Sequence, residues 1–226
     1  MRIVTWNCNL SFAKKFEHLE YIDADILIIQ ECENLQENYF PNSKYFWTGR
    51  IENKGLGVLV KNSNAYIDPS HNKNLINFLP IVSENIKILG VWAYNHRAMR
   101  FGKNANGNTV EAINFYEEWL KDDELPHIFG GDFNNSIIWD KPNHRNNFHN
   151  INARLKNLGF SSAYHSKTRD HFGSEKNATF FHTKQKSKKY HIDYLYTKSV
   201  TAISAEVGSY EDWIELSDHT PLIVDI

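Results

Sequence analysis

The chain has 226 residues, of which 41% are hydrophobic and 14% aromatic, so it is long enough to bury a sizeable core. Charged residues make up 23% and the formal net charge is −2 at pH 7, which excludes a protein that coats DNA through overall basicity. Any contact with a polyanion must therefore be local, or must come through metal ions.

The beginning of the chain and its cysteines indicate a cytoplasmic protein. Residues 1–6 already have the pattern of a β-strand, which leaves no room for a signal peptide. Apolar runs such as 26–29 are far too short to span a bilayer. Only Cys8 and Cys32 are present, so no disulfide framework is implied and we expect both to be reduced. The alternative is a mature chain that has lost its leader.

Short apolar runs bounded by Gly, Asn and Asp recur along the chain and are typical of β-strands. In chain order they fall at 3–6, 26–29, 58–60, 86–93, 127–129, 192–196 and 222–224. Helical spacing of apolar residues lies between some of them, at 12–21, 109–120 and 152–158. We expect 139–149 and 167–189 to be loops.

Many strands with a few helices between them predict an α/β or α+β layered fold. We find no internal repeat of fixed period, no low-complexity segment and no stretch with the composition of a linker. The whole chain, 1–226, is therefore expected to form one domain.

The run Gly130-Gly131-Asp132-Phe133-Asn134 directly follows an apolar strand, and it has two interpretations. Gly, Asp and Asn are the usual residues of turns, so a plain turn accounts for the run when it is taken alone. The other interpretation is a site that holds a phosphate and a water beside a metal ion. The rest of the chain must decide between them.

Polar residues follow several of the predicted strands at the point where each strand ends. They are Asn7, Glu31 after Gln30, Tyr94 and His96, Asp132 and Asn134, Asp193, and the pair Asp218-His219 just before the last strand. Strands of one sandwich can bring such ends to a common edge, where loops build a site on a rigid scaffold.

The side chains in this set favour phosphate ester hydrolysis. Carboxylate oxygens such as those of Glu31 and Asp218 suit Mg²⁺ or Mn²⁺, whereas two unpaired cysteines do not suit structural zinc. The imidazoles of His219 and His96 supply acid–base groups. A divalent ion, an imidazole and neutral amides together fit the attack of water on a phosphate ester.

The ordered motifs identify the chain as similar to a known family. Thr5-Trp6-Asn7, Gln30-Glu31, Gly131-Asp132-Phe133-Asn134, Ile192-Asp193-Tyr194 and Ser217-Asp218-His219 resemble the endonuclease/exonuclease/phosphatase superfamily, whose fold is deoxyribonuclease-I-like. The resemblance extends from Asn7 to His219 in the order that the family has. It implies a four-layer αββα sandwich, with two β-sheets packed face to face and helices outside.

The resemblance implies a role for each matching residue. Glu31 is the principal metal ligand, and Asn7 lies against the attacking water or the phosphate. Asp132 orients or deprotonates that water, and Asn134 donates to a phosphate oxygen.

Asp193 and His219 are expected to form a dyad in which the carboxylate fixes the imidazole tautomer and favours its charged form. His219 then stabilises the transition-state phosphate or acts as a base, and both roles stay open. Asp218 touches the metal directly or through a water.

The leaving-group side is open between two residues. The family places a His or Tyr after the strand at 86–93, and here Tyr94 has the better position and His96 the better chemistry. Glu52 is a candidate for orienting that group.

The substrate is not fixed by these motifs, because one site chemistry serves DNA nucleases, RNA exonucleases, inositol-phosphate phosphatases and sphingomyelinases in the superfamily. Tyr194 stands where inositol phosphatases tend to carry Arg, which favours a nucleic acid substrate, DNA or RNA. The lysines of 184–189 could contact its backbone, and Phe180 or Phe181 could stack on a base. A small phosphoester is the alternative, and a non-catalytic binding module is a third hypothesis.

Overall fold

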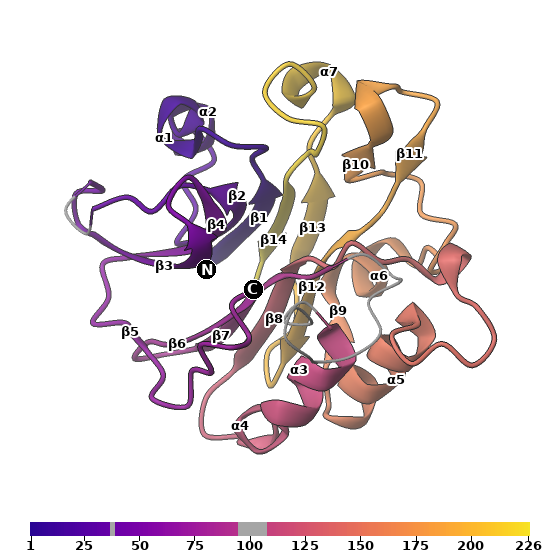
Figure 1. Ribbon diagram of the computed structural model, residues 1–226, viewed down its shortest axis with the longest axis horizontal. Coiled ribbons are helices and arrows are strands. Elements are labelled where there is room, and N and C mark those ends of the chain that lie inside the picture. The colour runs from indigo at the N-terminus through magenta and orange to yellow at the C-terminus, as the bar shows by residue number, and fades with distance from the viewer. Residues whose placement is uncertain (37–38, 95–107) are drawn as a thin grey trace.

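The structure is a computed structural model that describes residues 1–36, 39–94 and 108–226. Two six-stranded β-sheets lie face to face, with helices on their outer faces (Figure 1). The chain ends meet, because the Met1 ammonium donates to the carbonyl of Ile226 at 2.8 Å. Among the described residues, no helix is both long enough and apolar enough to cross a membrane.

The first sheet has the strand order β13-β14-β1-β2-β4-β3. Its strands are β1 (Arg2–Asn7), β2 (Ile26–Cys32), β3 (Ser43–Ile51), β4 (Lys54–Lys61), β13 (Ser204–Val207) and β14 (Leu222–Asp225). β1 and β2 run parallel, and β14 runs antiparallel to β1. Asn7 and Gln30 therefore reach the same edge of the sheet, side by side.

The second sheet has the strand order β5-β6-β7-β8-β12-β9. Its strands are β5 (Tyr66–Ile67), β6 (Phe78–Val82), β7 (Lys87–Trp92), β8 (His127–Asp132), β9 (Ser161–Ser162) and β12 (Asp193–Lys198). β7 and β8 are parallel and β12 is antiparallel to β8, so that Trp92, Asp132 and Asp193 lie in register at one edge.

The helices and one short hairpin complete the fold. The α-helices are α1 (Phe12–Lys15), α2 (Glu17–Glu20), α3 (Thr109–Phe115), α4 (Glu117–Lys121), α5 (Phe148–Asn157), α6 (Ala163–Thr168) and α7 (Tyr210–Trp213). Two 3₁₀ turns are η1 (Ile137–Trp139) and η2 (His182–Lys184), and the hairpin pairs β10 (Phe180–Phe181) with β11 (Lys189–Tyr190). The hairpin and α7 lie close together beyond the ends of the central strands (Figure 1).

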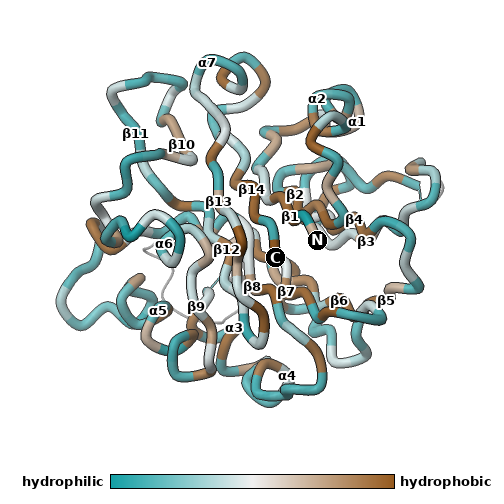
Figure 2. Tube along the Cα trace, turned by 180° about the vertical axis from the view of Figure 1, so that it is seen from behind, coloured by the Kyte–Doolittle hydropathy of each residue, from teal (hydrophilic) through white to brown (hydrophobic). Residues whose placement is uncertain are grey.

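Three separate hydrophobic clusters show why the chain forms four layers. Side chains of a strand alternate between faces, so Ile28 on β2 packs between the two sheets while Ile29 packs under α1, α2 and α7. In the same way Ile128 on β8 faces the other sheet, and Phe129 faces α3 and α5. Hydrophobic residues accordingly concentrate along the central strands, with hydrophilic loops around them (Figure 2). The αββα sandwich that the sequence predicts is confirmed.

Most of the predicted elements are present, with different ends. All seven predicted strands occur, but β3, the longest strand, was not predicted because Ser43–Ile51 mixes polar and aromatic residues. The predicted helix at 109–120 is broken at Tyr116 into α3 and α4, and the one at 152–158 begins earlier, at Phe148. The segment 167–189, predicted as loop, contains the β10–β11 hairpin.

Candidate active site

Three titratable side chains from three segments meet at the edge of the second sheet. Asp132 ends β8, Asp193 begins β12, and His219 precedes β14. Their ligand atoms all lie within 4.8 Å of one another, and all three residues are buried. The antiparallel register of β8 and β12 places the two aspartates side by side. Neither Glu31 nor Asp218 belongs to this group.

Asp193 and His219 form the predicted hydrogen-bonded dyad. His219 Nδ1 lies 2.9 Å from Asp193 Oδ2. Burial lowers the pKa of His219, but the charge and hydrogen bond of Asp193 and the charges of Asp132 and Asp218 outweigh it and raise the pKa to about 9. The imidazole is therefore charged at neutral pH, and its Nε2–H is the second donor of the ring.

The dyad is held in place by the hydroxyl groups of Thr179 and Ser217. Thr179 Oγ1 accepts hydrogen bonds from the backbone N–H groups of Ile192 and Asp193, each at 3.1 Å. Ser217 Oγ accepts from the N–H of His219 at 3.0 Å and donates to the carbonyl of Asn7 at 2.7 Å. These bonds fix the segment before β14 against β1. Thr179 gave no signal in the sequence, because a single buried threonine is ordinary.

The carboxylate of Asp132 is held by amides from both sheets. Asn7 Nδ2 donates to Oδ2 at 3.0 Å. Asn134 donates twice, from its backbone N–H to Oδ1 at 2.8 Å and from Nδ2 to Oδ2 at 2.9 Å. Asn134 Nδ2 also donates to the carbonyl of Ala93 at 3.2 Å. Both amide hydrogens of Asn134 are thus committed to protein acceptors, whereas Asn7 retains one for a ligand.

Asn134 was expected to donate to a phosphate oxygen, but both of its amide hydrogens already have acceptors within the protein. Its φ of 46° turns the side chain back onto the carboxylate two residues earlier, as Asn does in tight turns. In the structure, the side chain of Asn134 therefore holds the carboxylate of Asp132 in place. The run therefore forms a turn, and the same turn ends β8 with Asp132 beside Asp193 and His219.

Asp132 is a carboxyl group that resists ionisation. Complete burial raises its pKa, and the neighbouring charge of Asp193 raises it further, to about 7, against the opposing effects of His219 and the amides. A carboxylate with a pKa near neutrality is suited to exchange a proton with water.

Gly131 is required by the close approach of β7 to β8. A Cβ atom at this position would lie 1.9 Å from the carbonyl oxygen of Val91, and φ is +143°. Only glycine fits such a backbone. The Gly-Asp step therefore lets β8 end in Asp132 while staying paired with β7.

Glu31 occupies a β-bulge between β2 and β4. Gln30 pairs with Leu56 and Cys32 with Gly55, so Glu31 is the extra residue, and its φ is 59°. Bulges of this kind re-aim a side chain at the edge of a sheet. The Glu31 carboxylate lies 2.8 Å from the Lys54 ammonium, and its backbone carbonyl accepts from the N–H of Leu10 at 3.1 Å.

The remaining predicted residues lie at the same edge or outside the described residues. Asp218 is half-buried beside His219, and its carbonyl accepts from the N–H of Phe181 at 2.8 Å. Tyr94 follows β7 and is 39% exposed. His96 lies within 95–107, outside the described residues. Glu52 accepts a hydrogen bond from Asn34 Nδ2 at 2.9 Å.

The two cysteines pack into the interior. Cys8 and Cys32 are free and buried. Burial raises the pKa of both thiols, that of Cys32 to about 12, so neither is a nucleophile at neutral pH.

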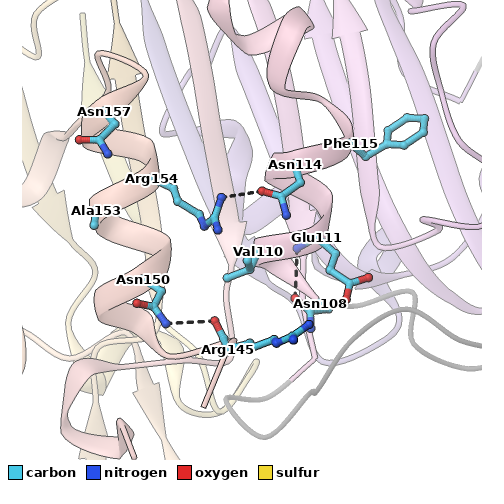
Figure 3. A pocket seen from close by; sticks show the side chains of 10 residues that line it. All are labelled: Asn108, Val110, Glu111, Asn114, Phe115, Arg145, Asn150, Ala153, Arg154 and Asn157. Carbon is cyan, nitrogen blue, oxygen red and sulfur yellow. Dashed lines mark hydrogen bonds between the residues drawn. The ribbon is translucent and has the colours of Figure 1, made fainter. Parts of the chain in front are cut away.

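A large surface cavity lies away from this group, between α3 and α5. Its volume is about 960 Å³, and its walls carry Arg145, Arg154 and several asparagines (Figure 3). Arg154 donates to Asn114 Oδ1 at 2.6 Å across the cavity. None of the residues that line it belongs to the Asp132–Asp193–His219 group, so its size does not mark the chemistry.

The two packed sheets bring a buried carboxylate–imidazole dyad and a second carboxylate together at one edge. This arrangement is that of a phosphoester hydrolase. Residues 4–219 match the model of the Endonuclease/Exonuclease/phosphatase family. The chain belongs to that family. Among curated proteins, none matches its sequence at a significant level.

Solved structures with the same fold are distant in sequence. The 3′ phosphatase NExo from Neisseria, bound to a product DNA hairpin, is 16% identical with a TM-score of 0.74, and the alignment covers 100% of this chain and 99% of that one. An AP endonuclease from Archaeoglobus fulgidus is 14% identical with a TM-score of 0.66 at the same coverage. The endonuclease domain of a telomere-specific non-LTR retrotransposon is 16% identical with a TM-score of 0.67, covering 100% and 97%.

Proposed function

We propose that this protein is a divalent-metal-dependent phosphodiester hydrolase that acts on nucleic acid, DNA or RNA, through attack of water on phosphorus. The observation that carries the proposal is the buried group of Asp132, Asp193 and His219, whose ligand atoms lie within 4.8 Å of one another. Burying such a group lowers stability unless its members are paired, and perturbed pKa values of this kind are typical of functional sites.

The metal of this proposal is Mg²⁺ or Mn²⁺, held by Glu31 and, directly or through water, by Asp218. These carboxylates offer the hard oxygen ligands that both ions prefer. The site also fits a cation on an observation independent of the family, because the Glu31 carboxylate already holds the ammonium of Lys54 at 2.8 Å. When bound, the ion would neutralise charge on the phosphate oxygens and favour ionisation of water.

Asp132 is proposed to orient the attacking water and take its proton. Its Oδ1 accepts one hydrogen bond, from the N–H of Asn134, so one acceptor position is left for a water. Its pKa of about 7 allows it to ionise and to accept a proton near neutral pH. Asn7 and Asn134 keep the carboxylate in one orientation, which lowers the entropy lost on reaching the transition state.

His219 is proposed to stabilise the charge that develops on the phosphate, rather than to act as a base. A pKa of about 9 keeps the ring protonated at neutral pH, and Asp193 occupies Nδ1. Nε2–H is then a charged donor for a phosphate oxygen, fixed before the substrate arrives. Tyr94 or His96 is proposed to act on the leaving-group side.

A nucleic acid substrate is supported by the aromatic and basic groups beside the dyad. The Phe180 ring lies 4.6 Å from the His219 ring and stacks on Tyr190, which contacts Trp139. Such rings suit the flat faces of bases and the apolar face of a sugar. Lys188 and Lys189 are exposed on the same hairpin, where they would contact the phosphate backbone.

The solved structures with this fold include a 3′ phosphatase bound to a product DNA hairpin and an AP endonuclease. We extend that substrate class to this chain as part of the proposal. We also propose that it works as a single domain in the cytoplasm, which its two free thiols support. A small phosphoester is the alternative substrate.

The test is hydrolysis of plasmid DNA, single-stranded RNA and bis-p-nitrophenyl phosphate with Mg²⁺ or Mn²⁺, against EDTA. We expect metal-dependent turnover that falls at least ~10²-fold in both Asp132→Asn and His219→Ala, the low end for a positioned acid–base group. Full activity in either variant would contradict the role assigned to the substituted residue. No turnover of any substrate by the folded wild-type protein would favour a non-catalytic binding module.

A further inference from the structure

We propose that Lys54 is a built-in counter-ion of Glu31, which occupies the carboxylate in the metal-free protein and sets the affinity of the site for its metal. The inference rests on the proposed function, because it takes Glu31 as the metal ligand. Its Nζ lies 2.8 Å from Glu31 Oε2, and the two side chains are 37% and 20% exposed.

The position of Lys54 is fixed by the backbone. It begins β4 and pairs with Ile51 across a two-residue turn of the β3–β4 hairpin. The tip of that hairpin is tied to the loop after Glu31 twice, because Asn34 donates to Glu52 from its backbone N–H at 2.6 Å and from Nδ2 at 2.9 Å. The ammonium is thus held beside Glu31 by the sheet, and the contact does not depend on the reach of a flexible side chain alone.

The second sheet also contacts the ammonium. Lys54 Nζ lies 5.6 Å from the centroid of the Trp92 ring, within the range of a cation–π interaction. Trp92 ends β7 and lies in register with Asp132 on β8. Lys54 therefore lies between a carboxylate of the first sheet and an indole of the second, at the edge where the site is built.

Lys54 forms its ion pair with Glu31, whereas Asp132 and Asp193 have other partners. Asp132 is held by the amides of Asn7 and Asn134, and Asp193 by His219. In the part of the chain that the structure describes, Lys54 is the one cationic side chain within 4.0 Å of the Glu31 carboxylate. Glu31, the carboxylate expected to be the principal metal ligand, therefore already has a lysine ammonium as its partner.

A metal ion at Glu31 must displace or repel this ammonium. Lysine carries a compact charge on a flexible stem, so the ammonium can leave the carboxylate without a change in the backbone. Removing the positive charge should have two opposite effects. The metal-free protein loses an ion pair and becomes less stable, while the site loses a competing cation and binds the metal more tightly.

The experiment measures the Kd of Mn²⁺ by isothermal titration calorimetry, and the Tm in EDTA and in saturating Mn²⁺. We expect Lys54→Met to bind Mn²⁺ about fivefold or more tightly than wild type, with a lower Tm in EDTA and a larger Tm increase on adding Mn²⁺. Lys54→Arg keeps the charge and should stay near the wild-type Kd.

Lys61→Met is the matched control, because Lys61 ends the same strand and forms an ion pair with Asp23 at 2.7 Å. It should lower the Tm in EDTA without changing the Kd of Mn²⁺. An unchanged or weaker Kd in Lys54→Met, or a gain shared by Lys61→Met, would overturn the counter-ion role.

Glu31→Gln separates this inference from the proposed function. If Glu31→Gln weakens Mn²⁺ binding but Lys54→Met does not tighten it, the counter-ion role fails and the metal site stands. If Glu31→Gln leaves the Kd of Mn²⁺ unchanged, the metal assignment fails, and the counter-ion role fails with it.

Discussion

At the scale of single residues, the site depends on side chains that constrain one another. Two amides hold the Asp132 carboxylate, and burial together with the charge of Asp193 raises its pKa to about 7. His219 is useful because Asp193 keeps it charged. Residue types and strand ends were enough to predict these side chains as a set. The direction of each amide was not predictable, because it depends on which acceptor the fold brings within reach.

Gly131 gives a prediction at this scale. Gly131→Ala places a methyl group against the carbonyl of Val91 and forces a non-glycine residue to φ +143°, so we expect the free energy of unfolding to fall by about 2 kcal/mol or more. Urea denaturation in EDTA measures it. Gly90→Ala is the control, because its nearest contact would be the side chain of Val58 at 3.0 Å, which can shift. Equal losses in both variants would contradict this reading of Gly131.

At the scale of elements, apolar runs located most strands of the core, but β6 (Phe78–Val82) was missed although it is apolar and fully buried. Apolar runs could not reveal β3, an edge strand in which three aromatic residues are flanked by polar ones. They could not reveal the bulge at Glu31 either, since a bulge depends on pairing with β4 rather than on the residues of β2 alone. Lys54 therefore escaped prediction, because its meeting with Glu31 follows from that pairing.

The β10–β11 hairpin gives a prediction that separates two substrate classes. Phe180 contacts His219, whereas Phe181 is buried against Tyr210. For a nucleic acid substrate, Phe180→Leu should raise KM for a single-stranded oligonucleotide about 10-fold, with a smaller change in kcat, because stacking on the ring is lost. Steady-state kinetics on the oligonucleotide and on methyl p-nitrophenyl phosphate measure the difference.

Phe181→Leu is the control for this prediction, because it should lower the Tm without changing KM. If Phe180→Leu leaves KM for the oligonucleotide unchanged and small esters are hydrolysed rapidly, the small-phosphoester alternative is favoured.

At the scale of the whole molecule, the site exists because both sheets end at the same edge. Asn7 comes from the first sheet and Asp132 from the second, and the hydrogen bond between them joins the two. Periodicity predicted layers, but it does not say which strands are neighbours. The order of the motifs along the chain supplied that information through the family resemblance, and the register of β8 with β12 accounts for it physically.

The joined site also couples folding to pH. The folded-state pKa of His219, about 9, lies above the ordinary value of 6.5, and that of Asp132, about 7, lies above 3.8. In both cases the folded protein binds a proton that the unfolded chain has lost. The stabilisation from His219 is therefore fully present below pH 6.5 and is lost as the pH rises through 9, and the Asp132 effect has the same sign between pH 3.8 and 7.

We therefore predict that the metal-free protein loses stability from pH 6.5 to 9, by on the order of 1 to 3 kcal/mol more than His219→Gln does over the same range. Urea denaturation in EDTA at each pH measures the free energy of unfolding, and the difference between the two proteins cancels the groups they share. Asp193→Asn removes the main source of the raised pKa of His219. This variant should therefore also lose less stability than the wild type between pH 6.5 and 9. A wild-type protein whose stability rises over this range relative to His219→Gln would mean that His219 is neutral in the folded state, and the charged role assigned to it at the phosphate would have to be given up.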